Sequence, residues 1–226
     1  MSDTLHSFSP LGPVGAALTH RDQRTVVAHY SSAAGELAAC HRSVGIALRT
    51  DLIARTLTTD GRYRSSGWES LELLAAGGIA FTREGWYCVA PEDSRATTVV
   101  GRPSAPIFEL VETEREAEHW SEDAGIYNVL GPRASELLAD LGLLGPAGDA
   151  RQVQPFAEAS LGGRPIRLIS QTLTNFLLLV QREDLETVWR VLVDTGRSRA
   201  AAAVGIEAVE RYQLGERRRV RLLEAI

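Results

Sequence analysis

Histidine side chains can ligate a metal or transfer a proton near neutral pH, so their spacing is informative. The chain has five, namely His6, His20, His29, His41 and His119. None of the intervals between them matches HxxxH or HExxH, the spacings that place two imidazoles on one helical face around a metal. The sequence therefore predicts no metal site. The histidines are expected to lie on the surface or to have their hydrogen bonds satisfied within the protein.

The chain contains no lysine, and all 24 of its basic residues are arginines. Schiff-base catalysis and the anchoring of pyridoxal phosphate both require a lysine amine, so the sequence excludes both. It also lacks a GxSxG nucleophile elbow and a glycine-rich phosphate loop. The two cysteines, Cys40 and Cys88, belong to no CxxC pair and are expected to be small buried side chains. The sequence therefore contains none of these catalytic motifs, and no catalytic residue is assigned.

The elements that must position any site alternate between helical and extended patterns, which favours an α+β fold. Residues 1–24, rich in Ser, Pro, Gly and His, are expected to form an N-terminal arm that is mobile or docked on the surface, and residues 25–226 a single domain. Helices are expected over 31–43, 68–76, 131–141, 183–196 and 201–214, and strands over 44–61, 86–89, 97–112, 124–130, 164–171 and 174–181, with a hairpin turn at 84–85.

Charge and hydropathy narrow the range of partners. The formal net charge of -5 provides no general attraction to phosphate backbones or anionic membranes, so nucleic acid is not expected as a partner. No window of eighteen apolar residues occurs, so we expect no membrane span and a cytoplasmic protein. The basic run 217–219 is interpreted as a solvated face, with contact to a partner or an acidic ligand as the alternative.

Three segments carry a family pattern in the same order. The first is Tyr30, Glu36 and Arg42, running into residues 44–46 (VGI). The second is residues 131–134 (GPRA) followed by a Leu-Leu pair, and the third is the stretch 175–214. Together they resemble the folate-binding domain of the glycine-cleavage T-protein (aminomethyltransferase) superfamily. The resemblance implies two related α/β halves around a central pocket, without the C-terminal barrel domain of the full T-protein. In length the chain is similar to the sarcosine oxidase gamma subunit of that superfamily.

The sequence departs from the family at its functional positions. The family has a pair of aspartates after the glycine-rich turn of the first half, whereas residues 77–81 here read GGIAF. The next strand ends in VAP at 89–91, where the family has an asparagine that contacts the pterin. A glutamate that holds the pterin ring belongs to a TGExGxE motif, replaced here by SQTLTN at 170–175. The arginines and glutamate of the last helix are replaced by Val209, Gln213 and Gly215.

The candidate ligand-binding residues follow from these positions. Gln171, Asn175 and Gln213 are neutral amides where the family has polar or charged groups, and a pocket lined by amides suits a neutral ligand. Trp86 and Tyr87 are aromatic residues that can stack on a flat ring. More often, one residue of such an adjacent strand pair faces the core and the other faces solvent. Arg211, in the last helix, completes the candidate set.

Three functions remain open at this stage. The family resemblance implies binding of tetrahydrofolate, or of a related small molecule in the central pocket, and transfer of a one-carbon unit. Without the usual aspartates, such an enzyme would be a transferase with reorganised chemistry. The second is a non-catalytic subunit that packs against a protein partner or forms a homo-oligomer. The third is a repurposed pocket for a neutral apolar small molecule.

Overall fold

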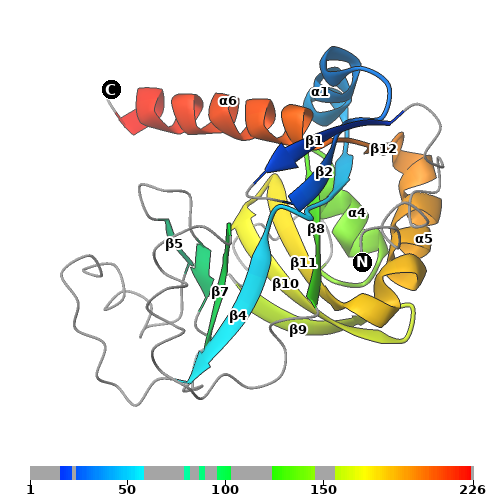
Figure 1. Ribbon diagram of the computed structural model, residues 1–226, viewed down its shortest axis with the longest axis vertical. Helices are drawn as coiled ribbons and strands as arrows, with labels where there is room; N and C mark the ends of the chain where they lie inside the picture. The colour runs from blue at the N-terminus through cyan, green and yellow to red at the C-terminus, as the bar shows by residue number, and fades with distance from the viewer. Residues whose placement is uncertain are drawn as a thin grey trace.

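The computed structural model describes residues 16–21, 24–58, 79–81, 87–89, 96–102, 124–145 and 156–224 (Figure 1). Its centre is a six-stranded sheet in the order β12-β3-β8-β11-β10-β9. The bounds are β12 (Ala202–Ala203), β3 (Gly45–Leu48), β8 (Ala124–Leu130), β11 (Asn175–Gln181), β10 (Arg164–Thr172) and β9 (Phe156–Leu161). Every neighbouring pair is antiparallel except β12 and β3, which run parallel.

Two smaller sheets and four helices surround this centre in the described part of the chain. The sheets are β4 (Ile53–Thr58), β7 (Ala96–Gly101), β6 (Tyr87–Val89) and β5 (Ile79–Phe81), and the ribbon of β1 (Ala17–Arg21) with β2 (Arg24–His29). The helices are α1 (Ala33–Arg42), α4 (Ala134–Asp140), α5 (Leu185–Gly196) and α6 (Ile206–Glu224). In Figure 1, α6 lies beside α1, on a different side of the large sheet from α4 and α5.

One face of the large sheet packs against α4 and α5. Alternate residues of β11, such as Phe176 and Leu178, point to this face, as the two-residue period of a strand requires. They meet Val188 and Leu192 of α5, which are one helical turn apart on the same side of that helix. The hydroxyl of buried Tyr127 donates to the carbonyl of Leu185 at 2.8 Å, joining β8 to the start of α5. This layer is the main apolar core.

The opposite face of the sheet, called the inner face below, has two separate apolar clusters. One contains Leu130 and packs under α1 and α6, and the other contains Ile126 and packs under β4 and β7. Asn128 lies between these two residues on the same strand and the same face. A polar region therefore interrupts the inner face where the two clusters meet.

The buried side chain of Glu36 connects three parts of the chain near the first segment that carries the family pattern. Its buried carboxylate accepts hydrogen bonds from the backbone N–H groups of Tyr30 at 2.7 Å, Ser31 at 2.9 Å and Gly205 at 2.8 Å. Gly205 lies against the backbone of Ala28, where a Cβ would come within 2.2 Å of a carbonyl oxygen. One carboxylate thus joins α1 to β2 and to the start of α6.

We expect Glu36→Gln to lower the free energy of unfolding by about 2–4 kcal/mol, because one acceptor oxygen must then serve three donors and a buried N–H faces another N–H. Urea unfolding measures the change. Glu186→Gln is the matched control, since Glu186 is exposed and its pair with Arg190 is worth about 0.5 kcal/mol or less. An equal loss in both variants would contradict this role of Glu36.

The Cys40 thiol is buried, as expected, beneath α6, whereas only the backbone of Cys88 is described. Burial raises the pKa of Cys40 to about 12, and the negative charge of Glu36 adds to the shift. In a Cys88→Ser variant we therefore expect no reaction with Ellman's reagent at pH 8 until denaturant is added, because only about one thiol in ten thousand is ionised. Rapid labelling of the native protein would contradict the burial of the Cys40 thiol.

Several expected elements form and one prediction is wrong. The strand pair predicted over 164–181 is β10 and β11, and the helix predicted over 183–196 is α5. Residues 202–203 are strand β12 rather than the start of a helix, because their backbone pairs with Gly45 and Ile46 of β3. Within the predicted arm, residues 17–21 form β1, which pairs with β2. Residues 1–15, the predicted helix 68–76 and the predicted turn 84–85 lie outside the described residues.

Candidate functional site

The polar region of the inner face is organised by Asn128, which is fully buried. Its side-chain N–H₂ donates to Asn175 Oδ1 at 2.7 Å and to the carbonyl of Phe176 at 2.9 Å. Its Oδ1 accepts from Gln213 Nε2 and from Arg49 Nη1, each at 3.4 Å. Each donor and acceptor of this amide thus has a partner, and β8, β11, α6 and the residue that follows β3 are joined at one point.

Arg49 and Asp51 form the charged end of this group. The guanidinium donates to both carboxylate oxygens, from Nε at 2.8 Å and from Nη2 at 2.7 Å, and both side chains are buried. Burial alone would raise the pKa of Asp51. The charge and hydrogen bonds of Arg49, with a backbone hydrogen bond and the charge of Arg102, instead hold the pKa of this carboxyl below its usual value. The pair is therefore ionised and internally neutral.

Gln171 lies next to this group at the hairpin end of β10. Ile169 pairs with Leu177, and both belong to the inner-face cluster under β4 and β7. Two residues further towards the hairpin on that face, Gln171 on β10 comes beside Asn175 on β11. We call Arg49, Asp51, Asn128, Gln171, Asn175 and Gln213 the amide cluster.

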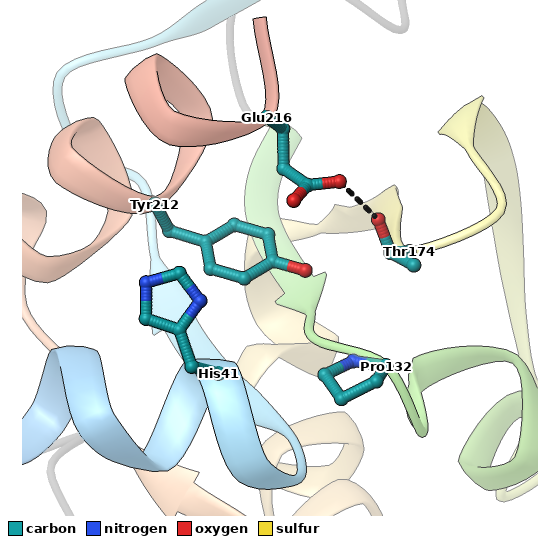
Figure 2. Close-up of a pocket in the computed structure, with 5 residues that line it drawn as sticks. All are labelled: His41, Pro132, Thr174, Tyr212 and Glu216. Atoms are coloured by element: carbon teal, nitrogen blue, oxygen red, sulfur yellow. Dashed lines mark hydrogen bonds between the residues drawn. The ribbon is translucent and has the colours of Figure 1, made fainter. Parts of the chain in front are cut away.

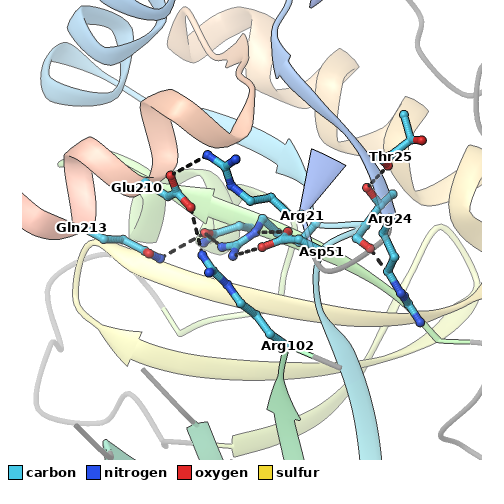
Figure 3. Close-up of polar contacts among 10 residues, drawn as sticks. Arg21, Arg24, Thr25, Asp51, Arg102, Glu210 and Gln213 are labelled. Carbon is cyan, nitrogen blue, oxygen red and sulfur yellow. Dashed lines mark hydrogen bonds and ion pairs between the residues drawn. The ribbon is translucent and has the colours of Figure 1, made fainter. Parts of the chain in front are cut away.

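The rim of the amide cluster is basic (Figure 3). Glu210 of α6 lies between Arg102 and Arg21, at 2.9 Å from Arg102 Nη2 and 3.6 Å from Arg21 Nη2. Arg24 donates to the carbonyl of Thr50 at 3.4 Å. Burial lowers the pKa of Arg24, and the positive charge of Arg182 adds to this effect.

A hollow lies where α1, α6 and the turn between β10 and β11 meet (Figure 2). It has a volume of about 280 Å³ and is lined by His41, Pro132, Thr174, Tyr212 and Glu216. The rings of His41 and Tyr212 are 5.1 Å apart, and Thr174 Oγ1 donates to Glu216 at 3.4 Å. Thr174 and Tyr212 precede Asn175 and Gln213 in sequence, yet those two amides do not line it. The amide cluster and this hollow are therefore separate sites.

The predicted site residues fall into three groups. The cluster contains all three predicted amides, Gln171, Asn175 and Gln213. Arg211 is exposed on α6 and takes no part in the cluster's hydrogen bonds. Tyr87 lies in β6, where only its backbone is described, and Trp86 lies outside the described residues.

Sequence reasoning missed Arg49, Asp51 and Asn128. A usable signal was present for Asn128, which is a polar residue at an inward position of an otherwise apolar strand, AGIYNVL. For Arg49 and Asp51 no local signal existed, because the arginine meets Asn128 across 79 residues of sequence. Among the described residues, no three His, Cys, Asp or Glu side chains come together as a metal ion would need. No described helix is long and apolar enough to cross a membrane.

Comparison with solved structures identifies the fold. The chain superposes on the glycine cleavage system aminomethyltransferase T from Bartonella henselae with a TM-score of 0.60 and 15% identity, over 86% of this chain and 57% of that one. It also superposes on one chain of the heterotetrameric sarcosine oxidase from Corynebacterium sp. U-96, in complex with pyrrole 2-carboxylate, with a TM-score of 0.54 and 15% identity. That match covers 76% of this chain and 94% of the other. The chain shares their fold.

This likeness confirms the mixed α/β, T-protein-like fold expected from the sequence. No protein-family model matches the sequence, and no curated protein matches it significantly. The chain spans little more than half the length of the Bartonella aminomethyltransferase. The likeness therefore extends to the fold, and the expected division into two related halves remains a prediction.

Proposed function

We propose that this chain binds tetrahydrofolate or a related small molecule, with the heterocycle held at the amide cluster. The observation that carries the proposal is the convergence of Gln171, Asn175 and Gln213 on one polar region of the inner face. The same three positions are those at which the T-protein pattern has polar or charged residues. A small set of polar groups set among apolar walls is typical of ligand sites.

The electrostatics of the cluster favour an uncharged ligand edge. The charge of Asp51 is balanced by Arg49 at 2.7 Å, so the cluster presents amide donors and acceptors without a free carboxylate. Ile169 and Leu177 border it on the same face as fully buried apolar side chains. The basic rim formed by Arg21, Arg24 and Arg102 suits the acidic tail that folates carry.

The proposal concerns ligand binding and assigns no catalytic step. A one-carbon transfer needs a group that moves a proton, and each buried carboxylate of the described residues already has partners. Glu36 accepts three backbone hydrogen bonds, Asp51 pairs with Arg49, and Asp184 pairs with Arg164 at 3.2 Å. Among the candidate residues we therefore assign ligand-binding roles and no catalytic role.

The test is binding of 5-formyl-tetrahydrofolate. At a ligand concentration of about 100 times Kd, binding adds about 2.7 kcal/mol of stability, which raises the Tm of a chain of this size by about 5–10 °C. Gln213→Leu is expected to weaken binding about tenfold, whereas Arg190→Gln, on the exposed side of α5, leaves it unchanged. No change in Tm or tryptophan fluorescence at millimolar ligand would refute folate binding.

A second function is favoured by one comparison. The chain covers 94% of a chain from a heterotetrameric enzyme, so its size suits a subunit that packs against larger partners. In that case, native purification from the source cells recovers a stoichiometric complex. A monomer in the native extract would contradict the subunit function and leave the ligand-binding proposal intact.

A further inference from the structure

The hollow shown in Figure 2 is a cavity that the proposed function does not use. It lies between the end of α1, the turn that follows β8, the β10–β11 turn and the middle of α6. Its volume of about 280 Å³ is just below the range of typical small-molecule sites, so it suits a ligand smaller than a folate. None of the six residues of the amide cluster lines it.

The walls of the hollow are held in place by the fold. Tyr212 is only 2% exposed and belongs to the apolar cluster under α1 and α6. The N–H of Gly131, the residue before Pro132, donates to the carbonyl of Thr174 at 2.8 Å, which ties two of the walls together. The rings of His41 and Tyr212 lie 5.1 Å apart at an interplanar angle of 46°. The hollow therefore has its shape before a ligand enters.

Three side chains with oxygen atoms lie on one side of the hollow. Figure 2 shows the Tyr212 hydroxyl and the Glu216 carboxylate on the side where Thr174 lies. Thr174 Oγ1 donates to Glu216 Oε2 at 3.4 Å, which is long for a hydrogen bond between two oxygens. A carboxylate has about four acceptor positions, and a hydroxyl has two beside its donor, so these groups can accept bonds in addition to those they make.

The only formal charge among the five lining side chains is the negative charge of Glu216. Arginines that neighbour the lining residues in sequence have contacts or positions elsewhere. Arg42 donates to a backbone carbonyl of α1 at 3.2 Å, and Arg211 is exposed. Arg133 pairs with Glu136 at 3.2 Å. The lining therefore favours a cation over an anion.

We propose that this hollow binds a primary ammonium group carried on a short apolar chain or ring. The three N–H donors of an ammonium match the three oxygen-bearing side chains, and its bond to Glu216 is charge-assisted. The apolar part of the ligand lies against the rings of His41, Pro132 and Tyr212, and a cation beside an aromatic face gains further attraction. Free amines and the lysine side chains of a protein partner both carry this group.

The test compares three compounds that share a benzyl group, by isothermal titration calorimetry at pH 8. Benzylamine carries the ammonium, benzyl alcohol is neutral, and benzyltrimethylammonium has the charge without N–H donors. We expect benzylamine to bind at least about tenfold more tightly than either analogue, because each analogue lacks a charge-assisted hydrogen bond to Glu216. An analogue that binds as tightly as benzylamine, or no binding of benzylamine at millimolar concentration, would overturn the proposal.

Variants on α6 locate the binding. Glu216→Gln keeps the shape of the side chain and removes its charge, so benzylamine is expected to bind at least about tenfold more weakly. Glu210→Gln is the matched control, because Glu210 is a carboxylate on the same helix that pairs with Arg102 outside the hollow. The same affinity in the two variants would mean that the hollow is not the amine site.

Tyr212→Phe provides an independent variant. It keeps the buried ring in its apolar cluster and removes only the hydroxyl, so we expect the fold to be retained and benzylamine to bind about threefold more weakly. Circular dichroism checks the fold. An unchanged affinity in this variant would contradict the assignment of the hydroxyl as one of the three acceptors.

A lysine model compound distinguishes the two sources of the ammonium group. Nα-acetyl-lysine amide carries the same group on a four-carbon chain. Tighter binding of this compound than of benzylamine would identify the ligand as a partner's lysine side chain, and weaker binding as a free amine. The proposed function is tested separately, since Glu216 is outside the amide cluster. If 5-formyl-tetrahydrofolate fails to bind and benzylamine binds as expected, only the folate proposal is wrong, and the reverse result refutes only the amine site.

Discussion

Arg49→Leu is expected to lower the free energy of unfolding by about 3–5 kcal/mol at pH 7, because it leaves the Asp51 carboxylate buried without its partner. Asp51 is 1% exposed and receives two hydrogen bonds from Arg49, so no solvent can replace the lost charge. Urea unfolding followed by circular dichroism measures the change. A loss below about 1 kcal/mol would mean that the pair behaves like a surface ion pair.

The same variant should show a characteristic dependence on pH. In the wild-type protein the pKa of Asp51 is lowered, so the stabilisation from the pair is present above about pH 4 and is lost as the pH falls through the folded-state pKa. In Arg49→Leu, burial without a partner raises that pKa, and the penalty grows as the pH rises above about 4. The difference in stability between the two proteins is therefore expected to be largest near pH 7 and to shrink as the pH falls below about 4.

The double variant Arg49→Leu/Asp51→Leu is the control. Two apolar side chains of similar volume often replace a buried ion pair at little cost. We therefore expect the double variant to recover most of the stability lost in the single one, and to lose the dependence on pH. A double variant as unstable as the single variant would assign the effect to Arg49 packing rather than to the uncompensated charge.

Gly131→Ala is expected to cost at least about 3 kcal/mol of unfolding free energy, from two separate causes. Gly131 has a φ of +124°, a region that a side chain with a Cβ rarely adopts. A Cβ there would also lie 2.2 Å from the carbonyl oxygen of Ser43, which is backbone and cannot turn away. The glycine N–H donates to Thr174 at 2.8 Å, so a shift of this backbone would also disturb the hairpin beside the amide cluster.

Two other glycines serve as matched controls for this effect. Gly142 has a φ of +72° with nothing within 4 Å of a new Cβ, so Gly142→Ala isolates the conformational cost of about 1 kcal/mol. Gly215 lies in α6 with open space around it, so Gly215→Ala should stabilise by about 0.5–1 kcal/mol. If all three variants changed the stability equally, contact with the Ser43 carbonyl could not explain the cost at Gly131.

Local patterns were sufficient for much of the large sheet. The apolar run of β11 and the three-to-four-residue spacing in α5 are contained within single elements, so a window of about ten residues predicts them. The alanine-rich stretch before α6 shows where such reasoning fails. Ala202 and Ala203 have high helix propensity, but pairing with the exposed edge of β3 makes them a strand.

The sequence by itself determined the absence of a lysine nucleophile and most elements of the described sheet, and together with the family resemblance it identified the candidate amides. The need for a glycine at 131 follows only from the structure. The tertiary structure alone decided that Asn128 lies at the centre of the amide cluster and that Arg49, 79 residues away, contacts it. It also decided that Gln171 is left without a partner among the described residues. The physical reason is that periodicity records which face of an element is buried, whereas strand order and register decide which buried side chains meet.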